Sequence, residues 1–128
     1  MSPFRFVRAL VVAATLLCAG ASHAATLRYL GKIWSNVVPG TLQMRIVLYP
    51  AGQDWAGTSR CRKVNGSGRC LFRTASAFIH FTSDGRFSGN IAGGACTAGG
   101  SGSPTTALSG SYRCGNGDSG QFYLRRLR

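Results

Sequence analysis

Hydrophobic and polar residues alternate along much of the chain after its first 24 residues. The stretch Thr41–Tyr49 shows this most clearly, because Leu42, Met44, Ile46 and Leu48 occupy every second position. Such alternation sends one row of side chains to a buried face and the other row to a solvated face. The pattern therefore predicts a half-buried β-strand.

Other short segments of the same character predict an all-β fold. They are Leu27–Trp34, Thr58–Val64, Ser67–Arg73, Ala77–Thr82, Arg86–Ala92, Ala107–Cys114 and Gly120–Leu127. No long stretch repeats apolar residues at helical spacing, and turns rich in Gly, Asn, Asp and Pro separate the segments. We expect a small antiparallel meander of about 7–8 short strands, which forms a barrel or a sandwich.

The segment Ala92–Thr106 breaks this pattern. Glycine, alanine, serine and threonine dominate it, and no large side chain occurs. Segments of this composition lack the side chains that would hold them against a core, so we expect a mobile loop that Cys96 pins at one point. This loop would serve as a plain connection or as a lid or contact loop.

The dipeptide Asp84-Gly85 predicts a tight hairpin, and the hairpin fixes the register of the strands on either side. In that register His80 lies opposite Gly89 and shares a face with the apolar Phe87. We therefore expect His80 to be a core residue rather than a catalytic base.

Residues 1–24 have the pattern of a secretory signal peptide. Two arginines supply a basic start, an apolar core follows at Ala9–Ala19, and Ser22–Ala24 offers small residues at both cleavage-determining positions. The apolar core is too short to span a bilayer. We expect a single β domain at 25–128 with no transmembrane segment, in a periplasmic or secreted protein.

Four cysteines follow this leader: Cys61, Cys70, Cys96 and Cys114. An even number in an exported chain favours two disulfides, because export compartments are oxidising. The dipeptide Asn65-Gly66 predicts a two-residue hairpin that places Cys61 directly opposite Cys70, so we pair these two. Cys96 with Cys114 follows by elimination. The absence of a C-x-x-C spacing, with His80 as the sole histidine of the mature domain, predicts that no metal site exists.

The chain is strongly basic, with 15 Lys and Arg against 3 Asp and Glu. Taking Arg5 and Arg8 away with the leader leaves 13 basic and 3 acidic residues, a net charge of +10. A charge of this size attracts anionic surfaces, so we expect an anionic envelope polymer, a nucleic acid or an acidic protein surface as partner. The alternative is that the charge serves solubility and keeps the protein a monomer, which is the oligomeric state we expect.

The register predicted from Asn65-Gly66 also gathers arginines on the side of the sheet that faces away from the disulfide. Arg62 would lie directly opposite Arg69, and like charges in that position destabilise a sheet unless an anion lies between them. Our candidate anion-binding residues are Arg60, Arg62, Arg69 and Arg73. The alternative is a solvated face that resists aggregation.

The inventory of reactive side chains argues against an enzyme. Asp84 and Asp118 fall in predicted turns, where aspartate ordinarily bonds the backbone, and Asp54 falls in a predicted loop. No pair of carboxylates in separate environments is available for acid and base roles. We therefore expect no catalytic residue and no cofactor.

These observations predict an exported, non-enzymatic binding protein with an arginine-rich face. One alternative is a protein-directed inhibitor or an immunity protein of a secreted enzyme. A second alternative is a barrel whose partly unfilled interior carries a small ligand. Most aromatic residues are needed to fill the core, and Trp55, in a predicted loop flanked by glycines, is the one we expect to be exposed.

Overall fold

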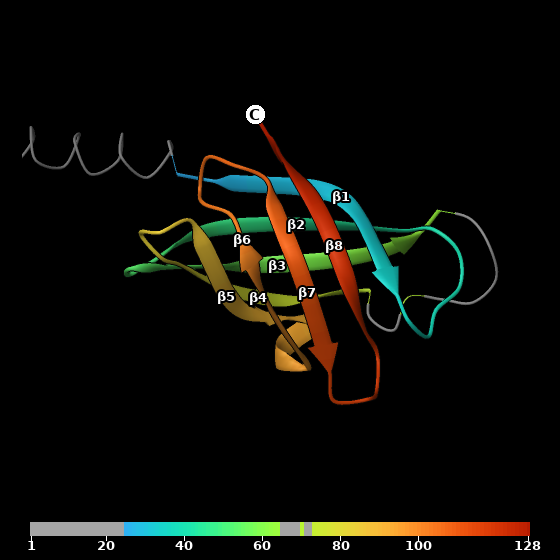
Figure 1. The fold of residues 1–128 in the computed structure, drawn as a ribbon. Helices are drawn as coiled ribbons and strands as arrows, with labels where there is room; N and C mark the ends of the chain where they lie inside the picture. Colours follow the sequence, from blue (N-terminus) through green and yellow to red (C-terminus); the bar gives the residue numbers. More distant parts are fainter. Residues whose placement is uncertain (1–24, 65–69, 71–72) are drawn as a thin grey trace, which may run out of the picture.

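The computed structural model describes residues 25–64, 70 and 73–128, and these residues form a closed β-barrel (Figure 1). The strands are β1 (Leu27–Ser35), β2 (Leu42–Ala51), β3 (Asp54–Lys63), β4 (Thr74–Phe81), β5 (Arg86–Ile91), β6 (Cys96–Ser101), β7 (Leu108–Cys114) and β8 (Ser119–Leu127). A short 3₁₀ helix, η1 (Ala92–Gly94), lies between β5 and β6. The predicted signal peptide lies outside the described residues.

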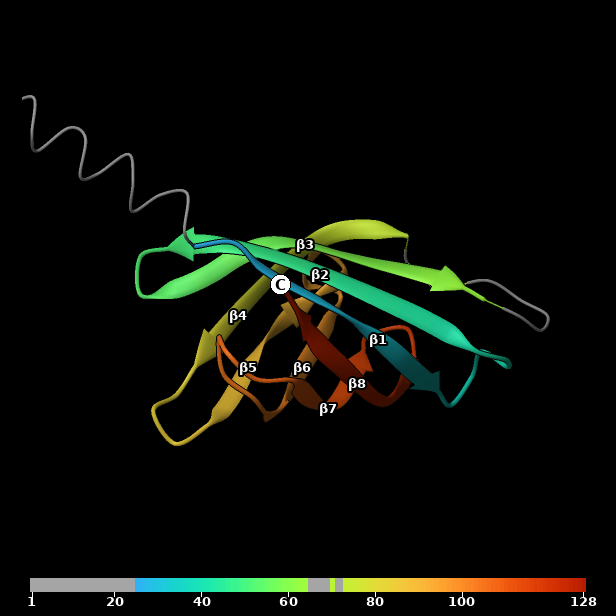
Figure 2. The same ribbon diagram turned by 90° about the horizontal axis from the view of Figure 1, so that it is seen from above.

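The strands pair in chain order, and the last strand returns to the first. Each strand is antiparallel to the next, and β8 pairs with β1 from Arg28 opposite Leu127 to Ser35 opposite Gly120 (Figure 2). The prediction of an all-β meander is confirmed, and the pairing of β8 with β1 makes it a barrel rather than a sandwich. Closure gives every strand a partner on both sides.

The inward row of side chains fills the barrel. In β2 the four alternating apolar residues predicted to be buried are at most 2% exposed. Phe87 and Phe122 meet inside the barrel with their ring centroids 5.9 Å apart. Tyr29 is fully buried, and the guanidinium carbon of Arg126 lies 5.7 Å from the centre of the Tyr29 ring. Burial of this apolar area is the main favourable contribution to folding in a domain of this size.

The prediction of a mobile loop over 92–106 was wrong, because residues 96–101 form β6 between β5 and β7. Strand pairing uses backbone groups, which a glycine-rich segment supplies as well as any other. The absence of side chains also lets the backbones approach, since a Cβ at Gly110 would lie 2.1 Å from the carbonyl oxygen of Gly99. Alternation of apolar residues therefore fails as a signal at this strand.

The connection from β6 to β7 is held in place by long-range hydrogen bonds. The buried Tyr29 hydroxyl donates to the carbonyl oxygen of Ser103 at 2.9 Å. The Arg126 Nε donates to the carbonyl oxygen of Pro104 at 3.0 Å. The two donors lie on β1 and β8, the first and last strands, so the connection belongs to the fixed part of the barrel.

The register predicted for the hairpin at Asp84-Gly85 is wrong by one residue. His80 lies opposite Ser88, not Gly89, and Phe81 lies opposite Phe87. A shift of one residue moves every side chain of a strand to the other face. Phe87 is therefore buried as expected, while His80 points outward.

The first disulfide was predicted correctly, but from a register that β3 does not adopt. Arg60 pairs with Thr74 on β4, and the Cys61 amide donates to the carbonyl oxygen of Arg73 at 2.8 Å, so Cys61 is not directly opposite Cys70. The connection between β3 and β4 is longer than a two-residue turn. Cys61 and Cys70 are nevertheless bonded, with their Cα atoms 5.9 Å apart. The predicted turn itself, Asn65-Gly66, lies outside the described residues.

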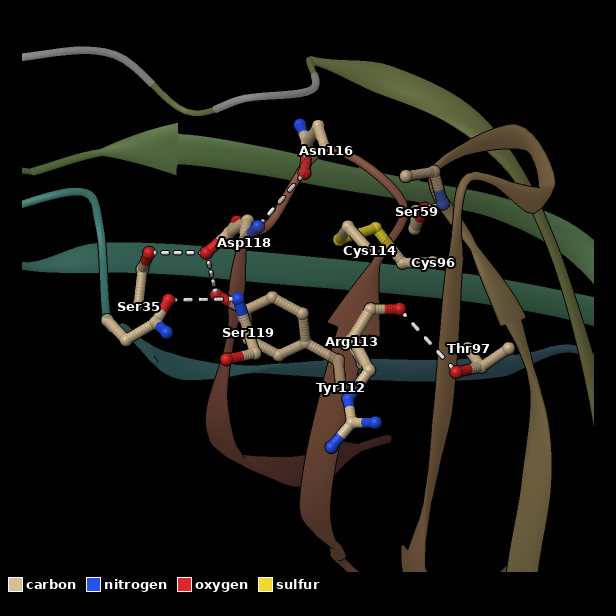
Figure 3. Close-up of a disulfide and its surroundings, with 12 residues drawn as sticks. Ser35, Ser59, Cys96, Thr97, Tyr112, Arg113, Cys114, Asn116, Asp118 and Ser119 are labelled. Carbon is tan, nitrogen blue, oxygen red and sulfur yellow. Dashed lines mark hydrogen bonds between the residues drawn. A yellow bond between two sulfur atoms is a disulfide. The ribbon is translucent and has the colours of Figure 1, made fainter.

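The second predicted disulfide is also confirmed (Figure 3). Cys96 on β6 lies directly opposite Cys114 on β7, and their Cα atoms are 3.9 Å apart. Both cysteines are buried. This bond ties the glycine-rich strand to its neighbour, where few side chains are available to do so.

Candidate functional site

Basic side chains gather on the outside of four neighbouring strands, β8, β1, β2 and β3. Alternation turns every second residue of each strand outward, and many of these positions carry arginine or lysine. We call this set the basic face: Arg28, Lys32, Arg45, Arg60, Arg62 and Arg125, all of them exposed. Charge of one sign gathered on one surface attracts counter-charged ligands.

One row of opposite residues crosses all four strands of the basic face. Arg125 lies opposite Leu30, Leu30 lies opposite Arg45, and Arg45 lies opposite Arg60. The Cβ atoms of directly opposite residues are about 5 Å apart, so Arg45 and Arg60 hold two like charges side by side. The predicted opposition of Arg62 and Arg69 lies outside the described residues, because Arg69 is not among them; the described residues show the same kind of like-charge pair at Arg45 and Arg60.

Three arginines of this face surround a small cavity of about 210 Å³. Arg45, Arg60 and Arg62 line it together with the amide of Gln43 and the apolar Leu30. Guanidinium groups donate hydrogen bonds and accept none, and their planar fork matches the oxygens of phosphate, sulfate or carboxylate. The cavity therefore has the chemistry of an anion site.

A second cavity, of about 520 Å³, brings together three of the four arginines proposed from the sequence. Arg60, Arg62 and Arg73 line it beside the Cys61–Cys70 disulfide. Arg69 lies outside the described residues. Arg45 was not among the predicted residues, although its polar position in the alternating strand at Thr41–Tyr49 already assigned it to the outer face.

Each of the three acidic residues is engaged by a partner that is not on the basic face. Asp54 contacts His80, Asp84 accepts a hydrogen bond from the Thr82 hydroxyl, and Asp118 is bound by two hydroxyl groups. Within the described part of the chain, no ion pair involves a residue of the basic face. The positive charge of this face is therefore not compensated by acidic side chains.

Asp118 has a structural position in the turn between β7 and β8, as its place in a predicted turn suggested. Its carboxylate is buried and accepts hydrogen bonds from the Ser35 hydroxyl at 2.6 Å and the Tyr112 hydroxyl at 3.2 Å (Figure 3). Burial raises the pKa of Tyr112 to about 12. The network joins the ends of β1, β7 and β8 from inside the barrel.

His80 is exposed, so the prediction of a core histidine was wrong. Its Nδ1 lies 2.6 Å from a carboxylate oxygen of Asp54, and Ser88 is directly opposite it on β5. Among the described contacts, no hydrogen bond joins Ser88 to His80. Ser88 also lies within a regular strand, where backbone amides pair with neighbouring strands, whereas an oxyanion hole needs free N–H groups. Among the described residues, His80 and Asp54 are placed as in a triad, and no serine is hydrogen-bonded to His80.

Two large aromatic side chains are exposed beside the basic face. Trp34 on β1 and Tyr123 on β8 are 54% and 52% exposed. Trp55, the aromatic residue predicted to be exposed, is partly buried and packs against the core. The alternation of β1 and β8 places Trp34 and Tyr123 outward, which was the signal that could have identified them.

No group of His, Cys, Asp and Glu able to hold a metal ion occurs among the residues that the structure describes. None of the helical segments in that part of the chain has the length and apolar character to cross a membrane. The two disulfides are compatible with an extracellular or periplasmic protein.

Comparisons with protein-family models, curated proteins and solved structures give no match.

Proposed function

We propose that this is a non-enzymatic binding protein whose basic face takes an anionic partner. The observation that carries the proposal is the pair Arg45 and Arg60, which lie directly opposite each other on β2 and β3. Like charges in this position destabilise a sheet, and an anion bound between them removes the repulsion. The partner is an anionic envelope polymer, a nucleic acid or an acidic protein surface.

The test is binding of the oxidised domain 25–128 to heparin and to a DNA duplex across a salt series. Affinity should fall steeply with salt, because bound cations release counterions from a polyanion. The double variant Arg45→Gln/Arg60→Gln should bind at least about tenfold more weakly at low salt, since each charge-assisted hydrogen bond is worth roughly 1.5–3 kcal/mol. The slope of the logarithm of its binding constant against the logarithm of the salt concentration should become shallower by about one for each arginine–phosphate interaction that the variant removes.

A matched control separates a site from diffuse charge. Arg113→Gln removes one exposed arginine from β7, away from the basic face, and is compared with Arg45→Gln, which removes one from within it. The proposal requires a larger loss of affinity for Arg45→Gln. Equal losses would leave general attraction as the whole effect.

The other candidate classes give different results in the same experiments. An inhibitor or immunity protein would form a stoichiometric complex that survives moderate salt. A carrier of small ligands needs an open interior, whereas Tyr29, Phe87 and Phe122 fill the described interior. Since the proposed partner contacts arginines, His80→Ala should leave polyanion binding unchanged.

A further inference from the structure

A groove of about 810 Å³ crosses the outer surface of β5, β6, β7 and β8, where the side chains are short. One row of opposite residues passes through it, from Ser88 through Gly99, Ser111 and Gln121 to Trp34 on β1. The surface is hollowed there because Gly99 has no side chain and the serines beside it have short ones. The volume is in the range of ligand-binding sites.

Trp34 and Tyr123 line the groove where it reaches β8 and β1. Trp34 lies opposite Gln121, and Tyr123 is two residues further along the same outward row of β8, so the two rings are diagonal neighbours. Both rings are about half exposed. A domain of this size needs its large aromatic residues in the core, so two adjacent rings left in water mark a contact surface.

Apart from glycines and the buried Phe87 and Phe122, the rest of the lining is polar and nearly neutral. Ser88 and Ser111 supply hydroxyl groups, which both donate and accept, and Gln121 supplies an amide with two donor hydrogens and an acceptor oxygen. One acid and one base, Asp84 and Arg86, contribute opposite charges. The groove therefore combines aromatic rings with mixed donors and acceptors, without an excess of positive charge.

We propose that this groove binds uncharged sugar units of an oligosaccharide. A pyranose ring has an apolar C–H face, which packs against an aromatic ring, and a rim of hydroxyl groups that need both donors and acceptors. A single-stranded nucleic acid requires a positively charged track beside the stacking rings, and a purely apolar ligand requires an apolar lining. The groove itself holds one base and one acid, so it meets the first set of needs. The cations nearest to its rings, Lys32 and Arg125, lie outside it on the basic face. The groove adjoins the basic face at Trp34 and Tyr123, but no residue of the basic face lines it.

The test uses three neutral tetrasaccharides, cellotetraose, maltotetraose and chitotetraose, with the oxidised domain 25–128. The chain has two tryptophans, so Trp55→Phe leaves Trp34 as the fluorescent reporter. At least one sugar should change the emission of this variant. Calorimetry should then give an affinity for that sugar that Trp34→Ala and Tyr123→Ala each lower by about tenfold.

Two controls make the result specific. Tyr49→Ala removes a tyrosine that is equally exposed, at 54%, but lies on β2 outside the groove, and it should leave the affinity unchanged. Ser111→Leu should abolish binding, because it fills the groove without altering either aromatic ring. Circular dichroism of each variant verifies that the barrel is folded.

Several results would overturn the proposal. They are the absence of binding by all three sugars at millimolar concentration, an equal loss for Tyr49→Ala and Tyr123→Ala, or tighter Trp34-dependent binding of oligothymidylate than of any sugar. The variant Arg45→Gln/Arg60→Gln should keep full affinity for the tetrasaccharide. Failure of the groove and failure of the basic face are therefore observed separately.

Discussion

The barrel presents two outer surfaces of different character on one scaffold. The basic face, on β8, β1, β2 and β3, carries long cationic side chains, whereas the groove on β5 to β8 carries short hydroxyl side chains and glycine. The inward row is apolar beneath both surfaces. Because the inward row supplies most of the stability, the outward row is free to differ from strand to strand. The outward positions are therefore where binding chemistry is found.

The largest expected effect is the loss of folding stability when the disulfide on the side of each surface is removed. Cys96–Cys114 joins β6 to β7, two of the strands that carry the groove, and spans 18 residues. Cys61–Cys70 spans 9 residues and lines a cavity of the basic face. The chain-entropy model gives a loss of about 3 kcal/mol for Cys96→Ala/Cys114→Ala and about 2.5 kcal/mol for Cys61→Ala/Cys70→Ala. Urea unfolding measures both losses.

The loss of heparin affinity should be larger for Cys61→Ala/Cys70→Ala than for Cys96→Ala/Cys114→Ala, which is the reverse of the order expected for stability. Cys61 and Cys70 line the same cavity as Arg62 and Arg73, so loss of their bond should loosen this cavity and lower heparin affinity. Loss of Cys96–Cys114 should leave heparin affinity within about twofold at a temperature where the barrel stays folded. If both variants lost heparin binding equally, the basic face would depend on the whole barrel rather than on its own disulfide.

The sequence allowed prediction mainly on the side of the basic face, where hydrophobic and polar residues alternate strongly. In β2 the apolar row predicted to be inward is buried, and the same pattern puts Arg45 outside. The even number of cysteines predicted two disulfides. Their pairing followed from the hairpin expected at Asn65-Gly66 and from elimination, and it is confirmed although β3 does not adopt that register. Arg60, Arg62 and Arg73 were identified as one group, and the structure places all three at one cavity.

The groove was not predicted, for two physical reasons. First, Gly99 and its neighbours in β6 carry no apolar pattern, since that strand is held by backbone pairing and a disulfide, so the sequence resembled a loop. Second, the turn at Asp84-Gly85 fixes the register to within one residue, and an error of one residue reverses the faces of the strand. That error put His80 in the core and hid its pairing with Asp54.

A smaller effect tests whether the two surfaces share one interior. Tyr29 lies inside β1 beneath the basic face, Tyr112 lies inside β7 beneath the groove, and burial raises the pKa of each to about 12 from 10. Between pH 10 and pH 12 the folded state therefore holds protons that the unfolded state has released. The free energy of unfolding should fall as pH rises through this range, by up to about 1.4 kcal/mol per pH unit for each tyrosine.

Urea unfolding from pH 9 to pH 12 measures this slope. Tyr29→Phe and Tyr112→Phe should each remove the contribution of one tyrosine to the slope, and the double variant should remove both contributions. Since both tyrosines belong to one cooperative core, binding at the two surfaces should fail over the same pH range. A slope unchanged in the double variant would exclude the two phenols as its source.

The smallest expected effect lies at the boundary between the surfaces. Trp34 lines the groove and also a cavity of about 570 Å³ that includes Lys32 and Arg125 of the basic face. A sulfated polysaccharide that occupies the basic face would therefore bring sugar rings to Trp34, whereas inorganic polyphosphate would engage the cations alone. Trp34→Ala should lower heparin affinity about threefold and leave polyphosphate affinity unchanged. Equal losses for the two polyanions would mean that Trp34 positions the cations instead of stacking on sugar, and no loss for either would mean that the two surfaces act independently.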